Sequence, residues 1–365
     1  IRMSKIYLAK QLYTGHQCLI NHAVEVEAGK VVAILPNEGL PENAGPLYDI
    51  IAPAFLDIQI YGADNKLLSV YPEVDALYRL YEYCIKGGAP NFIATVATND
   101  TQVFHQCIDA IKAYWAAGGK GCLGLHVEGP WLNPLKKGAH LESFIHSPSE
   151  QEVLNLLAYG KGVIKIITVA PEVLAPGIVA LIQAAGITVS AGHSNATYEE
   201  ATEAFDKGIG TVTHLFNAMS PLQHRAPGLV GAVFNHPSVL SSVVPDGYHV
   251  DFAAIKIAWK QMGQRLFAIT DAVAETSSGP YPHHLEGDKY ASNGILSGSA
   301  LTMVKCLQNL VKEVGVPIED ALRMVSTTPA KAIGDTSLGL IENGLPANLV
   351  CLNESLAVEA VITPN

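Results

Sequence analysis

Eight short apolar runs, separated by longer amphipathic stretches, constrain the fold of this 365-residue chain more than any other feature. Continuous apolar runs of this length are typical of strands that are buried on both faces, as in a parallel sheet, and the stretches between them have helical periodicity. Eight units of strand followed by helix predict an α/β fold of the (β/α)8 barrel type. The runs are residues 54–60, 91–98, 122–128, 163–170, 187–192, 210–215, 240–245 and 266–270.

The two ends of the chain lie outside these eight units. Residues 6–36 and 339–361 show strand-like runs that are broken by turn signals containing glycine. We therefore predict that residues 53–335 form the barrel, and that residues 1–52 and 336–365 combine into one small β-sandwich module beside it.

The composition narrows the range of partners and compartments. The net charge is −11, and no run of Lys or Arg is present that would follow a nucleic-acid backbone. The apolar runs are too short to span a membrane, and the first residues do not resemble the apolar core of a signal peptide. The six cysteines are scattered without a Cys-x-x-Cys pair, which favours buried thiols in a reducing cytoplasm over metal ligands or disulfides.

Ionisable side chains stand at the ends of four of the predicted strands. Glu128 ends the third run, His193 and His214 lie at the ends of the fifth and sixth, and Asp271 directly follows the eighth. In a (β/α)8 barrel the carboxyl ends of the strands meet at one face, where reacting groups lie. One carboxylate and two imidazoles that leave one position open are the usual ligands of a catalytic zinc ion.

Each of these residues also has a structural interpretation. A histidine at a strand end is more often a hydrogen-bonded structural residue than a ligand, and Glu128 is able to accept backbone N–H bonds. His126 lies two residues before Glu128, and we expect it to line the barrel. Four ionisable groups would nevertheless be costly to bury together without an ion or a substrate to compensate their charge. Their joint occurrence favours the metal site.

Six segments resemble, in the same order along the chain, those of the N-acetylglucosamine-6-phosphate deacetylase family of the amidohydrolase superfamily. Several matching segments in sequence order are more specific than any one of them. The segments are HVEGPWLN at 126–133, SAGHSNAT at 190–197, THLFNAM at 213–219, PGLVG at 227–231, DGYH at 246–249 and LSGSALT at 296–302.

This resemblance implies a role for each matching residue. Glu128, His193 and His214 would bind one divalent ion, zinc or alternatively iron, that lowers the pKa of a bound water towards about 7. Asp271 would act as the acid and base, and His140 would polarise the acetamide carbonyl. The implied reaction converts N-acetyl-D-glucosamine 6-phosphate to D-glucosamine 6-phosphate and acetate, a step of amino-sugar catabolism and cell-wall recycling.

The resemblance also implies how the sugar phosphate is bound. Arg225, His249 and the backbone at Asn217 and Ala218 would bind the phosphorylated end of the substrate. Members of the family are commonly homodimers, in which a residue such as Arg225 reaches the site of the neighbouring chain. Without the family, Arg225 would be interpreted as the partner of a surface carboxylate. The residues expected to line the sugar pocket are Ala139, Leu296, Ser297 and Gly298.

The first predicted strand departs from the pattern of many amidohydrolases. Those proteins end this strand with His-x-His, which supplies two ligands to a second ion, whereas this chain has Gln59 and Tyr61. Glutamine is a weaker ligand than imidazole, so we expect one tightly bound ion with Gln59 beside it. The same feature argues against a cyclic amidohydrolase or a base deaminase. A barrel that serves only as a scaffold is disfavoured because the four ionisable groups are all present.

Overall fold

An eight-stranded parallel sheet forms the centre of the structure, a computed structural model that describes residues 4–41, 43–292 and 294–364. Each strand falls within one of the eight predicted apolar runs, so the predicted barrel is confirmed. The sheet nearly closes, because Ile60 pairs with Ala272 beyond the last strand, and the Tyr61 N–H donates to the Ala272 carbonyl at 2.8 Å. In sheet order the strands are β14 (Leu266–Ala268), β13 (Leu240–Val243), β12 (Thr211–Val212), β11 (Thr188–Ala191), β10 (Ile164–Val169), β9 (Cys122–Glu128), β8 (Asn91–Ala97) and β5 (Leu56–Ile60).

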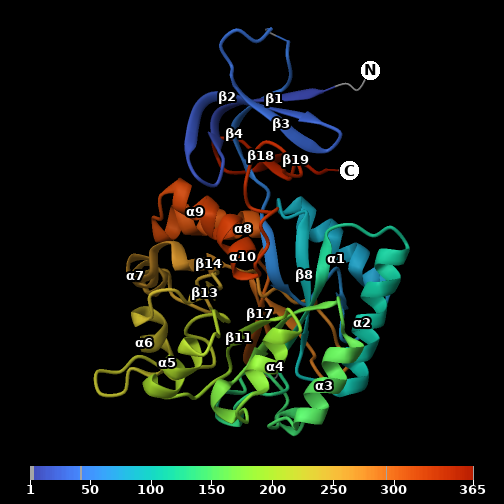
Figure 1. Cartoon of the computed structure of the whole chain (residues 1–365), viewed down its shortest axis with the longest axis vertical. Coiled ribbons are helices and arrows are strands. Elements are labelled where there is room, and N and C mark those ends of the chain that lie inside the picture. The colour runs from blue at the N-terminus through green and yellow to red at the C-terminus, as the bar shows by residue number, and fades with distance from the viewer. Residues whose placement is uncertain (1–3, 42, 293, 365) are drawn as a thin grey trace.

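Helices follow the strands and cover the outside of the sheet (Figure 1). Side-chain caps mark the beginnings of several of them. Thr197, for example, forms a reciprocal capping box with Glu200 at the start of the helix after β11. The helices are α1 (Val74–Lys86), α2 (Thr101–Ala116), α3 (Glu150–Tyr159), α4 (Ile178–Ala184), α5 (Tyr198–Asp206), α6 (Gly228–Asn235), α7 (Phe252–Met262), α8 (Met303–Asn309), α9 (Ile318–Val325) and α10 (Thr327–Ala332), with single turns at η1 (Pro134–Lys136), η2 (Glu142–Phe144), η3 (Pro171–Val173), η4 (Gly263–Arg265) and η5 (Leu310–Val314).

A layer of polar side chains lies inside the barrel, below the carboxyl ends of the strands. The His126 Nε2 is 2.7 Å from the Thr168 hydroxyl, which is 2.8 Å from the Thr213 hydroxyl. Ser190 extends this layer through a 2.7 Å contact with Thr213. Burial lowers the pKa of His126 to about 4. His126 is therefore a neutral residue that lines the barrel, as predicted from its place before Glu128.

The two ends of the chain meet in a separate sheet above the barrel (Figure 1). All six of its strands belong to one hydrogen-bonded sheet, in which β1 and β4 are parallel and the other pairs are antiparallel. Its apolar core includes Leu12, Val24, Ile51 and Leu349, so both ends of the chain contribute to it. In sheet order the strands are β19 (Val358–Ile362), β18 (Leu349–Leu352), β4 (Leu47–Pro53), β1 (Lys5–Tyr13), β2 (Cys18–Glu27) and β3 (Lys30–Pro36).

Two small β elements were not predicted from the sequence. One is the pair β6 (Gly62–Ala63) and β7 (Lys66–Leu67), which directly follows β5. The other is the three-stranded sheet of β15 (His284–Glu286), β16 (Lys289–Ser292) and β17 (Ile295–Ser299), which is inserted after β14. All six cysteines are free thiols, and five of them are buried. Within the described residues, no helix is both long and apolar enough to cross a membrane.

Candidate metal and active site

The predicted ionisable side chains meet in one cavity at the carboxyl ends of the barrel strands. The cavity has a volume of about 170 Å³. Its lining includes Glu128 from β9, His193 and His214 just beyond β11 and β12, Asp271 beyond β14, and His140 from the segment after β9. All five side chains are buried. The face predicted from strand order is thus the face at which these groups lie together.

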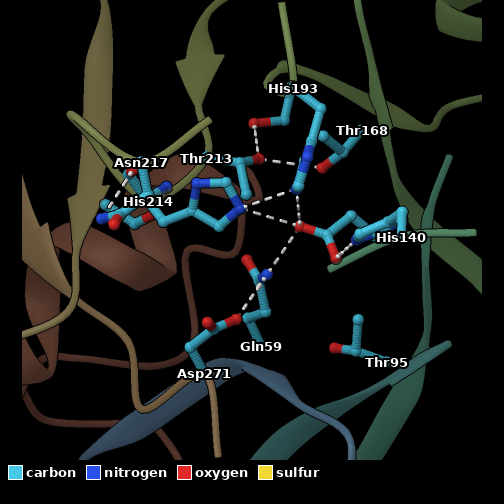
Figure 2. A network of polar contacts seen from close by, with 12 residues as sticks. Gln59, Thr95, His140, Thr168, His193, Thr213, His214, Asn217 and Asp271 are labelled. Carbon is cyan, nitrogen blue, oxygen red and sulfur yellow. Dashed lines mark hydrogen bonds and ion pairs between the residues drawn. The ribbon is translucent and has the colours of Figure 1, made fainter. Parts of the chain in front are cut away.

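One oxygen of Glu128 lies close to two imidazoles, those of His193 and His214, which point toward each other in Figure 2. The Glu128 Oε1 is 3.0 Å from the His214 Nε2 and 3.3 Å from the His193 Nε2, and the two nitrogens are 3.1 Å apart. Ligands at 2.0–2.1 Å from a tetrahedral zinc ion are separated by about 3.3 Å. The triangle of donor atoms therefore has the size that one such ion requires.

The hydrogen bonds of His193 determine which of its two ring nitrogens carries the proton and which has a free lone pair. Its Nδ1 is 2.9 Å from the Lys136 carbonyl, which is able only to accept. Nδ1 therefore carries the proton, and Nε2 has the free lone pair that a metal ligand needs. Burial, together with the neighbouring His140, lowers the pKa of His193 to about 4, so the ring is neutral at pH 7. The His193 Nε2 lone pair and the Glu128 carboxylate repel each other at this distance, and a cation bound between them would remove that repulsion.

The other oxygen of Glu128 faces a different histidine. The His140 Nε2 is 3.1 Å from the Glu128 Oε2, and the His140 Nδ1 is 2.7 Å from the Thr98 hydroxyl. Glu128, His140 and His193 also form a group whose ligating atoms all lie within 4.8 Å of one another. Burial acts to raise the pKa of Glu128, but the charge of His140 and the contacts with His140, His193 and His214 together outweigh it and hold that pKa well below its usual range. The carboxylate is ionised at neutral pH.

Gln59 joins the carboxylate of Glu128 to that of Asp271, and Figure 2 shows its side chain in contact with Asp271. The Gln59 Nε2 lies 3.0 Å from the Glu128 Oε1, 2.9 Å from the Asp271 Oδ1 and 2.8 Å from the Tyr61 hydroxyl. Three oxygens around one amide atom identify that atom as the nitrogen, which is a donor and not a metal ligand. These contacts place the Gln59 side chain beside Glu128, one of the predicted ligands.

Asp271 lies at the end of a second chain of contacts. Its Oδ2 is 3.9 Å from the His249 Nε2, and the His249 Nδ1 is 2.6 Å from the Asp246 Oδ2. Burial raises the pKa of Asp271, and the charge of Glu128 adds to this effect while His214 opposes it. A carboxyl with a raised pKa beside the donor triangle is suited to accept and return a proton. The sequence reasoning gave Asp246 no role, although it begins the DGYH segment.

Comparison with known proteins agrees with this geometry. The model of the Amidohydrolase family matches residues 50–363. The chain belongs to the amidohydrolase family. This amidohydrolase is 32% identical over 370 residues to an N-acetylglucosamine-6-phosphate deacetylase of Haemophilus influenzae, an alignment that covers 97% of this chain and 94% of the relative. An N-acetylgalactosamine-6-phosphate deacetylase of Shewanella is 30% identical over 320 residues, with 85% of this chain and 81% of the relative covered.

Solved structures of named deacetylases resemble the amidohydrolase over its whole length. The N-acetylglucosamine-6-phosphate deacetylase of Pasteurella multocida has a TM-score of 0.93 at 33% identity and covers 100% of this chain and 99% of its own. A mutant of the Mycobacterium smegmatis enzyme in complex with N-acetyl-D-glucosamine-6-phosphate has a TM-score of 0.91 at 28% identity and covers 99% of this chain and 98% of its own. The resemblance predicted from six short segments therefore extends over the fold.

Several site residues of the amidohydrolase adopt left-handed backbone conformations. The φ angles are 47° at His193, 39° at His214, 53° at Asp271 and 49° at Ala218. Such conformations cost about 1–3 kcal/mol for residues other than glycine and occur where the surrounding structure enforces them, often at active sites. Three of these residues lie within three positions of a strand end, so the sharp turn there directs the side chain into the cavity.

Of the residues predicted to bind the substrate, two do not line the cavity and the others do. Gly298 is not in the lining, and a Cβ there would lie 2.5 Å from Val273 and 3.2 Å from the Asp271 carbonyl, so glycine permits β17 to pack behind Asp271. Arg225 is exposed and does not line the cavity of its own chain. The predicted residues that do line the cavity are Ala139, Asn217, Ala218, His249, Leu296 and Ser297.

Among the lining residues that were assigned no role from the sequence, three have titratable side chains. Tyr61 contacts both Gln59 and Glu128, and Tyr281 packs near His140 with ring centroids 6.3 Å apart. His283 is held by the Ser297 hydroxyl at 2.8 Å from its Nδ1. Tyr61 was visible as an unusual residue after Gln59. No short motif marks the other two, which reach the site on the segment between β14 and β15.

Proposed function

We propose that this amidohydrolase hydrolyses the acetamide of N-acetyl-D-glucosamine 6-phosphate to D-glucosamine 6-phosphate and acetate. The observation that carries the proposal is the triangle of Glu128 Oε1, His193 Nε2 and His214 Nε2, with sides of 3.0–3.3 Å, beside Asp271 and His140 in one cavity. The names of the relatives support the choice of an acetylated amino-sugar phosphate.

Glu128, His193 and His214 would hold one divalent cation, zinc or alternatively iron, because carboxylate and neutral imidazole suit both. When bound, such an ion polarises a carbonyl oxygen and lowers the pKa of a water to about 7. Gln59 supports a single bound ion per chain. Its N–H groups point to the space between Glu128 and Asp271, where a second ion would need ligand atoms with lone pairs.

The chain's own groups supply the proton transfers. Asp271 takes a proton from the attacking water as the water oxygen bonds to the acetyl carbon. With its proton on Nε2, His140 shifts its hydrogen bond from the Glu128 Oε2 to the carbonyl oxygen as that oxygen gains negative charge. Asp271 then gives its proton to the amine nitrogen as the C–N bond breaks, and acetate and the free amine leave. The raised pKa of Asp271 suits it to hold the proton between these two steps.

Recognition of the phosphate requires donors beyond those of one chain. Among the described residues the cavity lining contains no Lys or Arg, so His249 and the backbone at Asn217 and Ala218 are the donors available within one chain. We propose a cytoplasmic homodimer in which Arg225 of each chain reaches the cavity of the other, because Arg225 is exposed on a loop.

We propose that residues 53–335 hold this site, and that 1–52 with 336–365 form the small module. The substrate is a small molecule, and we propose no nucleic-acid or membrane partner.

N-acetyl-D-galactosamine 6-phosphate is the second candidate substrate. Relatives from Shewanella and from Escherichia coli O157:H7, at 30% and 28% identity, are named as deacetylases of that sugar phosphate. Acetate release from both sugar phosphates and from unphosphorylated N-acetylglucosamine, with and without a chelator, distinguishes the candidates. We expect chelator-sensitive turnover that is fastest with the glucosamine derivative. A higher kcat/KM for the galactosamine derivative would reassign the substrate, and no acetate from any sugar would reject the proposed reaction.

A further inference from the structure

Tyr61 occupies a fixed position between the first and last strands of the barrel. Its N–H donates to the Ala272 carbonyl at 2.8 Å, and its own carbonyl accepts from the Leu68 N–H at 2.9 Å. The ring packs in an apolar cluster with Leu67, Val273 and Tyr281, and the side chain is buried. Backbone and ring therefore both restrict where the Tyr61 hydroxyl is able to point.

The hydroxyl has one proton, and its neighbours determine where that proton goes. The Gln59 Nε2 is a donor at 2.8 Å from the Tyr61 oxygen, so the oxygen accepts from it. The remaining neighbour is the Glu128 Oε2, which is able only to accept from a hydroxyl when the carboxylate is ionised. The Tyr61 proton is thus donated to Glu128.

The two oxygens of Glu128 consequently have different surroundings. Oε2 is held by the Tyr61 hydroxyl and by the His140 Nε2 at 3.1 Å. Oε1 faces the Nε2 atoms of His193 and His214 at 3.3 and 3.0 Å. A carboxylate whose outer oxygen is occupied in this way offers one oxygen, and not two, to a cation.

The hydrogen-bond count of Gln59 points in the same direction. Its amide nitrogen has two hydrogens but three oxygen neighbours, namely those of Glu128, Asp271 and Tyr61. If the Glu128 Oε1 binds a cation, the two amide hydrogens of Gln59 are donated to Asp271 and Tyr61. Each hydrogen then has one acceptor. Without the Tyr61 oxygen, one hydrogen of the buried amide would have to return to Glu128 and compete with the cation.

We propose that Tyr61 is a positioning residue that holds Glu128 as a one-oxygen ligand and thereby sets the affinity of the site for its metal ion. This inference rests on the metal centre of the proposed function. It assigns Tyr61 no contact with the reacting atoms, because its hydroxyl is fully engaged by Gln59 and Glu128.

The test is to substitute Tyr61→Phe, which keeps the ring that packs against Tyr281 and removes only the hydroxyl. Tyr114→Phe is the matched control, since the Tyr114 side chain is also buried and its hydroxyl donates to the Lys120 carbonyl at 2.6 Å, outside the cavity lining. Metal-free wild type and both variants are titrated with Zn²⁺ against a chromophoric chelator. Thermal unfolding of the metal-free proteins shows that each is folded.

We expect Tyr61→Phe to weaken Zn²⁺ binding about 10- to 100-fold, and Tyr114→Phe to leave it unchanged. X-ray absorption of the zinc-loaded proteins should show one more oxygen ligand in Tyr61→Phe, because the freed Glu128 Oε2 is able to bind as well. Unchanged affinity and coordination in Tyr61→Phe, or an equal loss in both variants, would overturn the role of Tyr61. A wild type that fails to bind Zn²⁺ would instead reject the metal centre itself, so the two failures are distinguishable.

Discussion

Replacement of Asp271 by asparagine is the most direct test of the proposed proton transfers. Asparagine has the same shape, is able to accept the hydrogen bond from Gln59, and tolerates the left-handed backbone at this position, where φ is 53°. The fold and the bound metal should therefore be retained. The variant is unable to take a proton from water, so turnover should fall by about 10²- to 10⁴-fold, which corresponds to about 2.7–5.5 kcal/mol of activation free energy.

The pH dependence gives a second measurement on the same variant. A general base must be ionised, and burial raises the pKa of Asp271 above its usual value. The wild-type kcat/KM should therefore decline as the pH falls through that raised pKa, at a higher pH than for an exposed aspartate, and Asp271→Asn should lose this acid limb. Acetate release across pH, with metal content and thermal unfolding measured on the same samples, makes the comparison. Near wild-type turnover of a metal-loaded Asp271→Asn protein at every pH would refute the mechanism.

Four further predictions follow from the same geometry. Elemental analysis should find about one divalent ion per chain, and two catalytically required ions would contradict the role of Gln59. Sedimentation should show a dimer at micromolar concentration, whereas a fully active monomer would exclude a shared site. Arg225→Ala should reduce kcat/KM for N-acetylglucosamine 6-phosphate on the order of 10²-fold while sparing the unphosphorylated sugar, and an equal loss for both would make Arg225 structural. Burial raises the pKa of Asp57 to about 7. A folded-state pKa above the unfolded value favours the fold at low pH, so the free energy of unfolding should decrease as the pH rises through about 7, and Asp57→Asn should lessen this slope in denaturant unfolding experiments.

The barrel and the face that carries the site were predictable because both depend on local patterns. A run such as 122–128 indicates a strand buried on both faces, and the carboxyl end of that strand places Glu128 without any knowledge of distant contacts. The turns that begin at His193 and His214 were harder to predict from the sequence. Left-handed residues other than glycine are imposed by tertiary structure and leave no pattern in the sequence.

Contacts between distant segments account for what the sequence did not show. Tyr281 and His283 come to the cavity on the segment between β14 and β15, which precedes three strands too short and too polar to stand out as periodic. Arg225 is a different case, since it does not line the cavity of its own chain, and the role proposed for it depends on the proposed dimer. Its position in the sequence next to the PGLVG segment carries no information about that assembly.

In the proposed site, the contacts of Gln59 would keep the metal ligand Glu128 and the base Asp271 apart in role although they lie side by side. An imidazole at this position would present a lone pair, and Asp271 could then be drawn in as a ligand of a second cation. The amide instead donates to the Asp271 Oδ1 at 2.9 Å, and leaves the Oδ2 facing the cavity and the His249 Nε2 at 3.9 Å. One carboxylate oxygen is thus restrained while the other remains available to a proton. In the proposed mechanism, a donor in place of a ligand would therefore limit the site to one ion and leave Asp271 as the base.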